Sequence, residues 1–161
     1  VPALEVDVEI LTQSVAILEW IEETFPDRPL LPSDPIKRAK VRAFAAAIGC
    51  DIHPLQNLRI LKKARELSGD DAEAGPAWAR HWISLGFDAL ETLAEQADGQ
   101  NGFIFGDGPT LAEIYLLPQM FNARRFGVVL APYPRLVAAD EAARALPEFE
   151  RAAPENQPDA V

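Results

Sequence analysis

The chain has 161 residues, of which 48% are hydrophobic, and its formal net charge at pH 7 is −10. This apolar content is sufficient for a packed core and argues against global disorder, while the acidity argues against a broad nucleic-acid-binding surface. One cysteine excludes an internal disulfide, and no apolar run has the length that a bilayer crossing needs. We therefore expect a globular cytoplasmic protein that binds neither nucleic acid nor membrane.

Residues 1–10 alternate between polar and apolar side chains with a period of two, which predicts a pair of short strands. Two strands alone are only marginally stable, and no further strand pattern follows, so we expect partner strands to precede Val1. The alternative is a frayed hairpin that packs on helices. The turn at Asp7-Val8 contains no glycine, so we expect it to be looser than a tight hairpin turn.

The remainder of the chain has helical periodicity. Ser14 is a favourable N-cap, and we expect the helix it begins to end at Pro26. Residues 27–34 contain two prolines and predict a linker between domains, after which Pro35 suits a first helical position. The apolar face of the first helix contains Ile17, Leu18, Ile21 and Phe25.

A long helix should follow, with a kink or break near Asp51 because Pro54 lies inside the pattern. The next helix should begin at Pro76 and bury a stripe of apolar residues. The members of that stripe are Trp78, Trp82, Phe87, Leu90 and Leu93.

Thr110 and Glu113 have the spacing of a capping box. They predict a central helix that is apolar almost all round, which Pro118 should kink. Two shorter helices should follow, around residues 136–146 and from Pro147.

Polar residues that could bind a ligand occur at the start of the first helix. There, free backbone N–H groups and the helix dipole favour a carboxylate, and Gln13 and Ser14 add donors. The alternative is that Ser14 is a plain N-cap.

A second group of polar residues surrounds the expected helix break: Asp51, His53, Asn57 and Arg59. His53 and Asn57 are four residues apart and share a face if the turn persists. Asp51 and His53 could supply two metal ligands, but no further His or Cys cluster completes the shell, so we expect no metal. The alternative is a solvated helix face.

Arg124 and Arg125 follow the central helix. One of them is explained by the negative end of the helix dipole. Adjacent helical residues point about 100° apart, so at most one should enter a given pocket. The single cysteine, Cys50, follows Gly49 in an apolar stretch, and we expect it to be buried and structural.

These motifs together resemble the zeta class of glutathione transferases, which includes maleylacetoacetate and maleylpyruvate isomerases. The similarity runs from Val1 to about Pro147 in collinear order. The matching residues are Gln13-Ser14, His53-Pro54-Leu55-Gln56-Asn57-Leu58, Leu116-Leu117-Pro118-Gln119, Asn122-Ala123-Arg124-Arg125-Phe126 and Tyr133-Pro134.

The resemblance implies a mainly α fold. An all-α C-terminal domain, residues 35–161, would follow the end of a thioredoxin-like glutathione-binding domain, residues 1–26, with residues 27–34 as linker. It also implies a homodimer.

The implied activity is glutathione-dependent cis–trans isomerisation of a small dicarboxylate, either maleylacetoacetate or maleylpyruvate, with glutathione regenerated as a cofactor. The resemblance assigns glutathione binding to Val1, Pro2, Gln13, Ser14, Asp51, His53 and Asn57, and binding of the acidic substrate to Arg59 and Arg125. Val1 and Pro2 match the position of a cis proline in such domains, although a trans proline at a strand start is the alternative from sequence alone.

The serine- and cysteine-containing motif of the class is absent from these 161 residues. We therefore expect no catalytic residue in this chain and place it in a segment before Val1. Two alternatives stay open at this point. One is a general glutathione transferase or peroxidase, and the other is a non-catalytic scaffold of the same fold.

Overall fold

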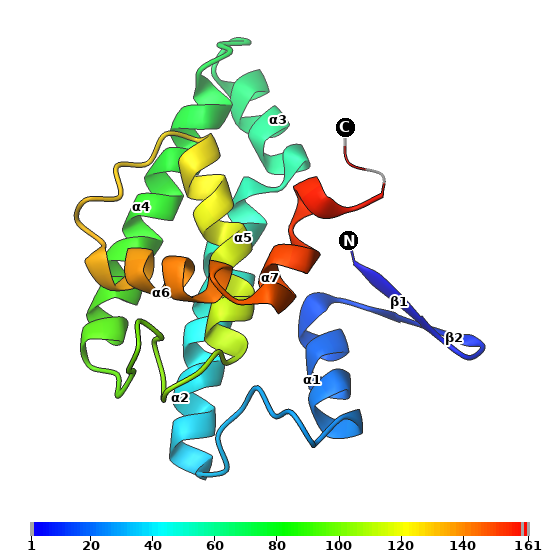
Figure 1. Cartoon of the computed structure of the whole chain (residues 1–161). Coiled ribbons are helices and arrows are strands. Elements are labelled where there is room, and N and C mark those ends of the chain that lie inside the picture. The colour runs from blue at the N-terminus through cyan, green and yellow to red at the C-terminus, as the bar shows by residue number, and fades with distance from the viewer. Residues whose placement is uncertain (1, 159, 161) are drawn as a thin grey trace.

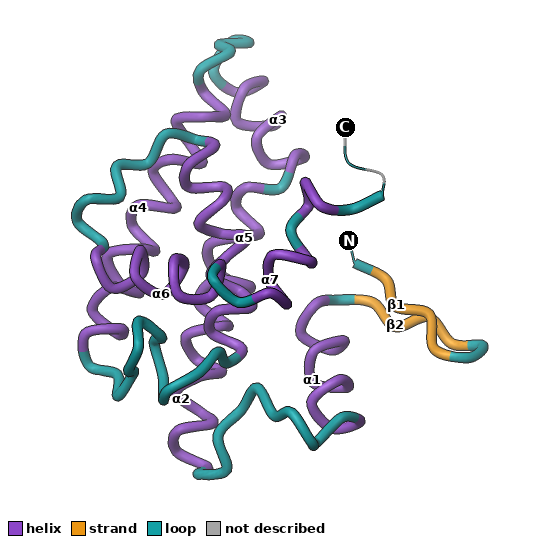
Figure 2. Tube along the Cα trace, viewed as in Figure 1, coloured by secondary structure: helices purple, strands orange, loops and turns teal. Residues whose placement is uncertain are grey.

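A computed structural model describes residues 2–158 and 160. Within them, a β-hairpin is followed by a bundle of α-helices, and the hairpin projects away from the bundle (Figures 1 and 2). Of the described helices, none combines the length and the apolarity that a membrane crossing requires. The elements are β1 (Ala3–Val6), β2 (Glu9–Thr12), α1 (Ser14–Thr24), α2 (Pro35–Ala46), α3 (Leu58–Leu67), α4 (Ala74–Glu95), α5 (Leu111–Arg125), α6 (Pro134–Arg144) and α7 (Pro147–Ala152).

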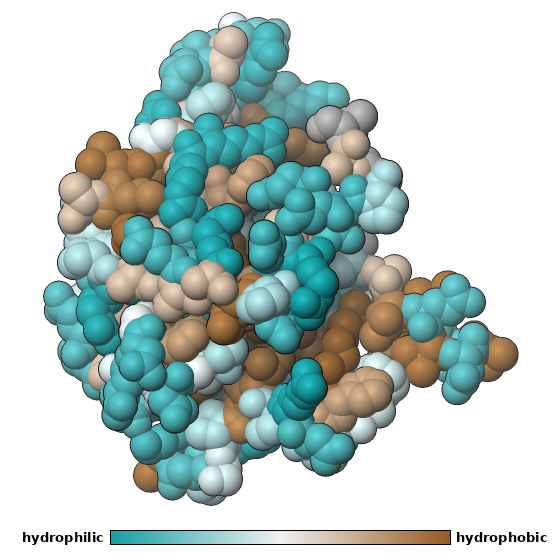
Figure 3. Space-filling model, viewed as in Figure 1, coloured by the Kyte–Doolittle hydropathy of each residue, from teal (hydrophilic) through white to brown (hydrophobic). Residues whose placement is uncertain are grey.

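The hairpin forms the expected strand pair, but its turn is tight. β1 and β2 are antiparallel with Val6 opposite Glu9, so only Asp7 and Val8 form the turn. The expectation of a looser turn was wrong because Asp7 adopts a positive φ of 54°, a conformation that Asp tolerates better than most residues. The side chains of Val8 and Ile10 are 92% and 68% exposed, and apolar atoms cover part of the projecting hairpin in Figure 3.

Helix α1 begins one residue earlier than the sequence predicted. Ser14 is its first helical residue, and Gln13 occupies the N-cap position with φ 72° and without a side-chain capping bond. The helix ends at Thr24, just before Pro26, and a loop leads to Pro35 at the start of α2. Asp34 caps α2 by accepting a 2.8 Å hydrogen bond from the backbone N–H of Lys37.

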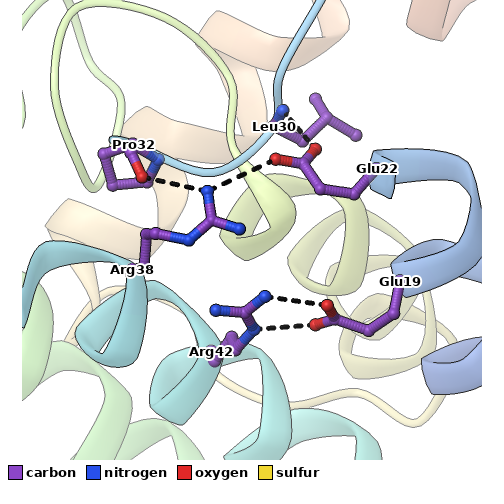
Figure 4. Close-up of polar contacts among 6 residues, drawn as sticks. All are labelled: Glu19, Glu22, Leu30, Pro32, Arg38 and Arg42. Carbon is purple, nitrogen blue, oxygen red and sulfur yellow. Dashed lines mark hydrogen bonds and ion pairs between the residues drawn. The ribbon is translucent and has the colours of Figure 1, made fainter. Parts of the chain in front are cut away.

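Two acidic side chains attach α1 to the next helix (Figure 4). Glu19 accepts two 2.8 Å hydrogen bonds from the Arg42 guanidinium. Glu22 is buried, accepts a 2.8 Å bond from the N–H of Leu30 and lies 3.8 Å from Arg38. These contacts set the position of the α1 N-terminus relative to α2.

The predicted helix break lies between α2 and α3. α2 continues into a π-helical segment, Ala47–Ile52, and then a 3₁₀ segment, His53–Gln56. Pro54 has no N–H to continue an α-helical ladder, and π-helical turns often occur at functional sites.

The core lies where α5 packs between α2 and α6, with α4 against α6 and the π-helical segment. α5 is the expected central helix, and it continues through Pro118. Its capping box is confirmed: Thr110 accepts from Ala112 N–H, and Glu113 accepts from Thr110 N–H at 2.8 Å. The largest fully buried apolar side chains are Phe44, Phe87, Ile48, Ile83, Leu90, Ile104, Leu116, Met120 and Leu136.

The predicted buried stripe of α4 is confirmed at Phe87 and Leu90 and was wrong at Trp78 and Leu93. Trp78 and Leu93 are 37% and 42% exposed, whereas the buried face contains Ala79, Ile83, Phe87, Leu90 and Ala94. Trp78 lies at the edge of that face because its indole N–H donates to the carbonyl of Leu55 at 3.1 Å, and an indole with a polar partner suits a half-exposed position.

Candidate active site

A cavity of about 530 Å³ opens between the start of α1, the helix break and α5. Figure 1 shows the start of α1 beside the base of the hairpin. The cavity is lined by Pro2, Gln13, Ser14, Val15, Ile17, Leu18, Ile48, Gly49, His53, Pro54, Asn57, Ile114, Tyr115, Pro118 and Gln119. Five residues predicted to bind glutathione are therefore brought together here, and they come from parts of the chain more than 35 residues apart. Their role in binding stays a prediction, and Val1, also predicted to bind glutathione, lies outside the described residues.

The N-terminus of α1 forms one wall. The first backbone bond of this helix is donated by Ile17 N–H to Gln13 carbonyl at 3.0 Å, so the N–H groups before Ile17 have no acceptor within the helix. Neither Gln13 nor Ser14 provides a capping side chain, and the Ser14 hydroxyl makes no hydrogen bond within the described protein. This end of the helix can therefore bind a carboxylate.

The helix break forms the opposite wall. The 3₁₀ segment places His53 at its start, and Asn57 directly follows it before α3. Both side chains border the cavity, as the sequence spacing suggested.

Two neighbours in the sequence behave differently. Asp51 is exposed and is not among the lining residues. Cys50 is also exposed, so the prediction of a buried structural cysteine was wrong. Both residues lie in the π-helical segment, whose wider turn rotates side chains away from the positions that α-helical spacing predicts.

Helix α5 adds two polar groups that we did not predict as site residues, Tyr115 and Gln119. Gln119 is 1% exposed, and its side-chain N–H donates to Gln56 Oε1 at 3.2 Å. Its Oε1 has no hydrogen-bond partner in the part of the chain that the structure describes. Burial raises the pKa of the Tyr115 hydroxyl, which keeps it protonated at neutral pH. Their spacing of four residues on a helix was the available signal.

The predicted substrate arginines lie outside the lining. Arg59 near the start of α3 and Arg125 at the end of α5 are exposed, and neither is in an ion pair within residues 2–158. Arg124, by contrast, is bonded to the fully buried Asp140, which also accepts from Arg144 at 2.9 Å. The Arg124 side chain is therefore already paired within the protein, whereas those of Arg59 and Arg125 are available to a ligand.

Comparison with known proteins identifies relatives along the whole chain. Residues 76–139 match the family model of the glutathione S-transferase C-terminal domain. The chain is 51% identical over 161 residues to maleylpyruvate isomerase from Ralstonia sp., covering 100% of this chain and 76% of that protein.

Solved structures give the same result. The holo structure of a maleylpyruvate isomerase, described as a bacterial zeta-class glutathione S-transferase, aligns with a TM-score of 0.95 and 50% identity over 100% of this chain and 76% of that one. Maleylacetoacetate isomerase from Anaeromyxobacter dehalogenans, solved with glutathione in the active site, aligns with a TM-score of 0.89 and 46% identity over 99% of this chain and 72% of that one.

Proposed function

Because the chain belongs to the zeta-class glutathione transferase family of maleylpyruvate and maleylacetoacetate isomerases, we propose that it acts as a glutathione-dependent cis–trans isomerase of a small unsaturated dicarboxylate. The observation that supports this most directly is the cavity, where the free N-terminus of α1 faces the side chains of the helix break and of α5. The identity of the substrate, maleylpyruvate or maleylacetoacetate, is left open.

The residues around the cavity fit glutathione. The peptide carries carboxylates, and the unsatisfied N–H groups at the α1 N-terminus, with the hydroxyl of Ser14 and the amide of Gln13, offer donors for one of them. The peptide also carries N–H groups, for which the side chains of His53 and Asn57 supply acceptors across the cavity. A cavity of about 530 Å³ is within the range of sites that bind ligands of this size.

Bound glutathione would supply a thiol nucleophile that adds to the cis double bond and leaves again after the resulting single bond has rotated. The residues of this chain hold the peptide and orient the acidic substrate. The substrate is an anion and the protein carries a net charge of −10, so local positive charge is needed at the site. We assign that charge to Arg125, with Arg59 as the second candidate.

The remaining proposals concern the whole molecule. We propose that residues 27–34 link a glutathione-binding unit to the helical domain that begins at residue 35. We also propose that the protein is cytoplasmic, which suits its exposed free Cys50.

We also propose a homodimer, in which Asp51 and His53 lie near the subunit boundary. Two-fold dimers are the commonest oligomers, and the outer face of α4 exposes Leu85. Light scattering of the full-length gene product should then report twice the mass of one subunit.

Ser14→Ala tests the glutathione site. Its hydroxyl makes no capping bond, so the substitution should leave the melting temperature nearly unchanged, whereas loss of a hydrogen bond to a carboxylate should weaken glutathione binding by about 10- to 100-fold. Calorimetric titration of the full-length gene product measures this. Ser84→Ala is the matched control, because Ser84 lies on α4 and bonds the carbonyl of Arg80.

Isomerase kinetics on the same protein tests the reaction itself. Turnover of maleylpyruvate or maleylacetoacetate only in the presence of glutathione supports the proposal. Glutathione binding without isomerisation would favour a general transferase or peroxidase, and absence of both would favour a non-catalytic scaffold.

A further inference from the structure

The wall of the cavity formed by α5 carries hydrogen-bonding groups that the protein leaves unused. Tyr115 lines the cavity, and within the described residues its hydroxyl has no hydrogen-bond partner. One turn further along the same face, the Oε1 atom of the buried Gln119 is also unpaired. A buried acceptor without a partner is costly, so two unused groups on one wall point to a polar ligand there.

The orientation of the Gln119 amide follows from its neighbours. The carbonyl of Ile52 can only accept, so the atom of Gln56 that lies 3.2 Å from it must be the amide nitrogen. Gln56 then presents its oxygen to Gln119, which must donate from Nε2. The free atom of Gln119 is therefore its oxygen, so the α5 wall of the cavity carries an acceptor one helical turn from Tyr115.

The position of the Tyr115 ring depends on a glycine. A Cβ atom at Gly49 would lie 2.7 Å from Cε1 and 3.6 Å from Cζ of Tyr115, so only glycine allows the ring to lie this close to the π-helical segment. Both residues line the cavity. The hydroxyl is thus held at the cavity by close packing of its ring on Gly49.

We propose that the Tyr115 hydroxyl is a substrate-binding group that donates a hydrogen bond to the ketone oxygen conjugated with the cis double bond of the substrate. This inference rests on the proposed isomerase function. Maleylpyruvate and maleylacetoacetate both contain such a ketone, followed by a second ketone two carbons further on. The bond reaches the first of these two ketones, the one conjugated with the double bond.

A hydrogen bond from Tyr115 to the ketone oxygen would also assist the reaction. Attack at the conjugated double bond moves electron density toward the ketone oxygen, and a donor already in place stabilises that charge. The Tyr115 phenol is neutral at neutral pH, as an ordinary tyrosine is, and burial raises its pKa further, so it has the proton that the bond requires. No proton leaves the tyrosine in this step.

The test uses Tyr115→Phe in the full-length protein, with acetylpyruvate as a probe. Acetylpyruvate is a β-diketone carboxylate without a double bond, so it binds but cannot be isomerised. Its dissociation constant, measured by calorimetry in the presence of glutathione, should rise about 3- to 10-fold in the variant. The dissociation constants for malonate, which has no ketone, and for glutathione should not change, and kcat for the isomerisation should fall about 10- to 100-fold.

Tyr133→Phe is the matched control, because it removes the only other tyrosine hydroxyl of the chain. That hydroxyl donates to Asp88 at 2.9 Å, so its loss should lower the melting temperature and leave acetylpyruvate binding unchanged. Tyr115→Phe should do the reverse. An active wild type with unchanged probe affinity and kcat in Tyr115→Phe overturns this inference alone, whereas an inactive wild type overturns the proposed function.

Discussion

The two adjacent arginines at the end of α5 should differ in their roles, Arg125 in substrate binding and Arg124 in stability of the fold. Arg125 comes seven residues after Pro118, close to two full helical turns, so it lies on the face of α5 that borders the cavity. Arg124 comes nine residues after Tyr115, about 180° around the helix, and is bonded to Asp140. Arg125→Ala should therefore impair substrate binding, and Arg124→Ala should impair folding.

The expected size of each effect follows from exposure. Arg125 is exposed, so loss of its bond to a substrate carboxylate should cost about 1.5–3 kcal/mol, below the upper range for desolvated pairs. That corresponds to a rise in KM of roughly 10- to 100-fold. Arg125→Lys should recover only part of the loss, since an ammonium cannot form the two-point contact of a guanidinium.

For Arg124→Ala the relevant quantity is the free energy of unfolding. An isolated buried carboxylate would cost about 3–5 kcal/mol, but Asp140 keeps its bond to Arg144. We therefore expect about 1–2 kcal/mol, which lowers the melting temperature by roughly 2–8 °C. Its KM should stay at the wild-type value.

Steady-state kinetics with the dicarboxylate at saturating glutathione, together with thermal denaturation of each variant, separates the two effects. The reasoning is refuted if Arg124→Ala raises KM while Arg125→Ala has wild-type kinetics. If neither variant changes KM, the carboxylate is bound elsewhere, and Arg59→Ala is the next variant to measure.

Two further predictions concern the parts of the fold that position the site. The hydrogen bond with Arg42 lowers the pKa of Glu19 from its usual value of about 4.5. Glu19→Gln should therefore lower the free energy of unfolding by about 0.2–1 kcal/mol at neutral pH, measured by urea denaturation. This difference from wild type should vanish as the pH falls below 4.5 through the folded-state pKa, and a difference that persists unchanged at pH 3 would contradict the prediction. Gly86→Ala would place a Cβ 2.3 Å from Cδ1 of the buried Ile52, so it should lower the free energy of unfolding by about 1–3 kcal/mol. The control, Gly108→Ala, meets no atom within 4 Å and should leave stability unchanged. Equal urea midpoints for the two variants would show that the core accommodates the added methyl group.

Local signals in the sequence were sufficient for most element boundaries. Pro35, the Thr110–Glu113 capping box and Pro54 act through their own backbone geometry and hydrogen bonding, so they begin or interrupt helices wherever the chain places them. The same local reasoning misassigned Ser14 as an N-cap. The conformation of Gln13, with φ 72°, depends on how the hairpin meets α1, which no local pattern specifies.

Burial of individual faces was predicted less well. On α4 the predicted Phe87 and Leu90 are buried, but the buried face continues through the small Ala79 and Ala94 rather than through Trp78 and Leu93. The exposure of Cys50 and the absence of Asp51 from the cavity have one cause, the π-helical turn, which packs against α4 and α5.

By itself, the sequence determined the helical class of this protein, the order of its elements and the residue types able to bind an acidic peptide, because breakers, caps and periodicity act over short distances. Only the tertiary structure decided which of these residues meet. It placed the start of α1 beside His53 and Asn57 and separated Arg124 from Arg125. Among the described residues it also left the Tyr115 hydroxyl and the Oε1 atom of Gln119 without a hydrogen-bond partner at the cavity. Those outcomes depend on side-chain packing between distant segments, and such packing is settled only when all the helices assemble together.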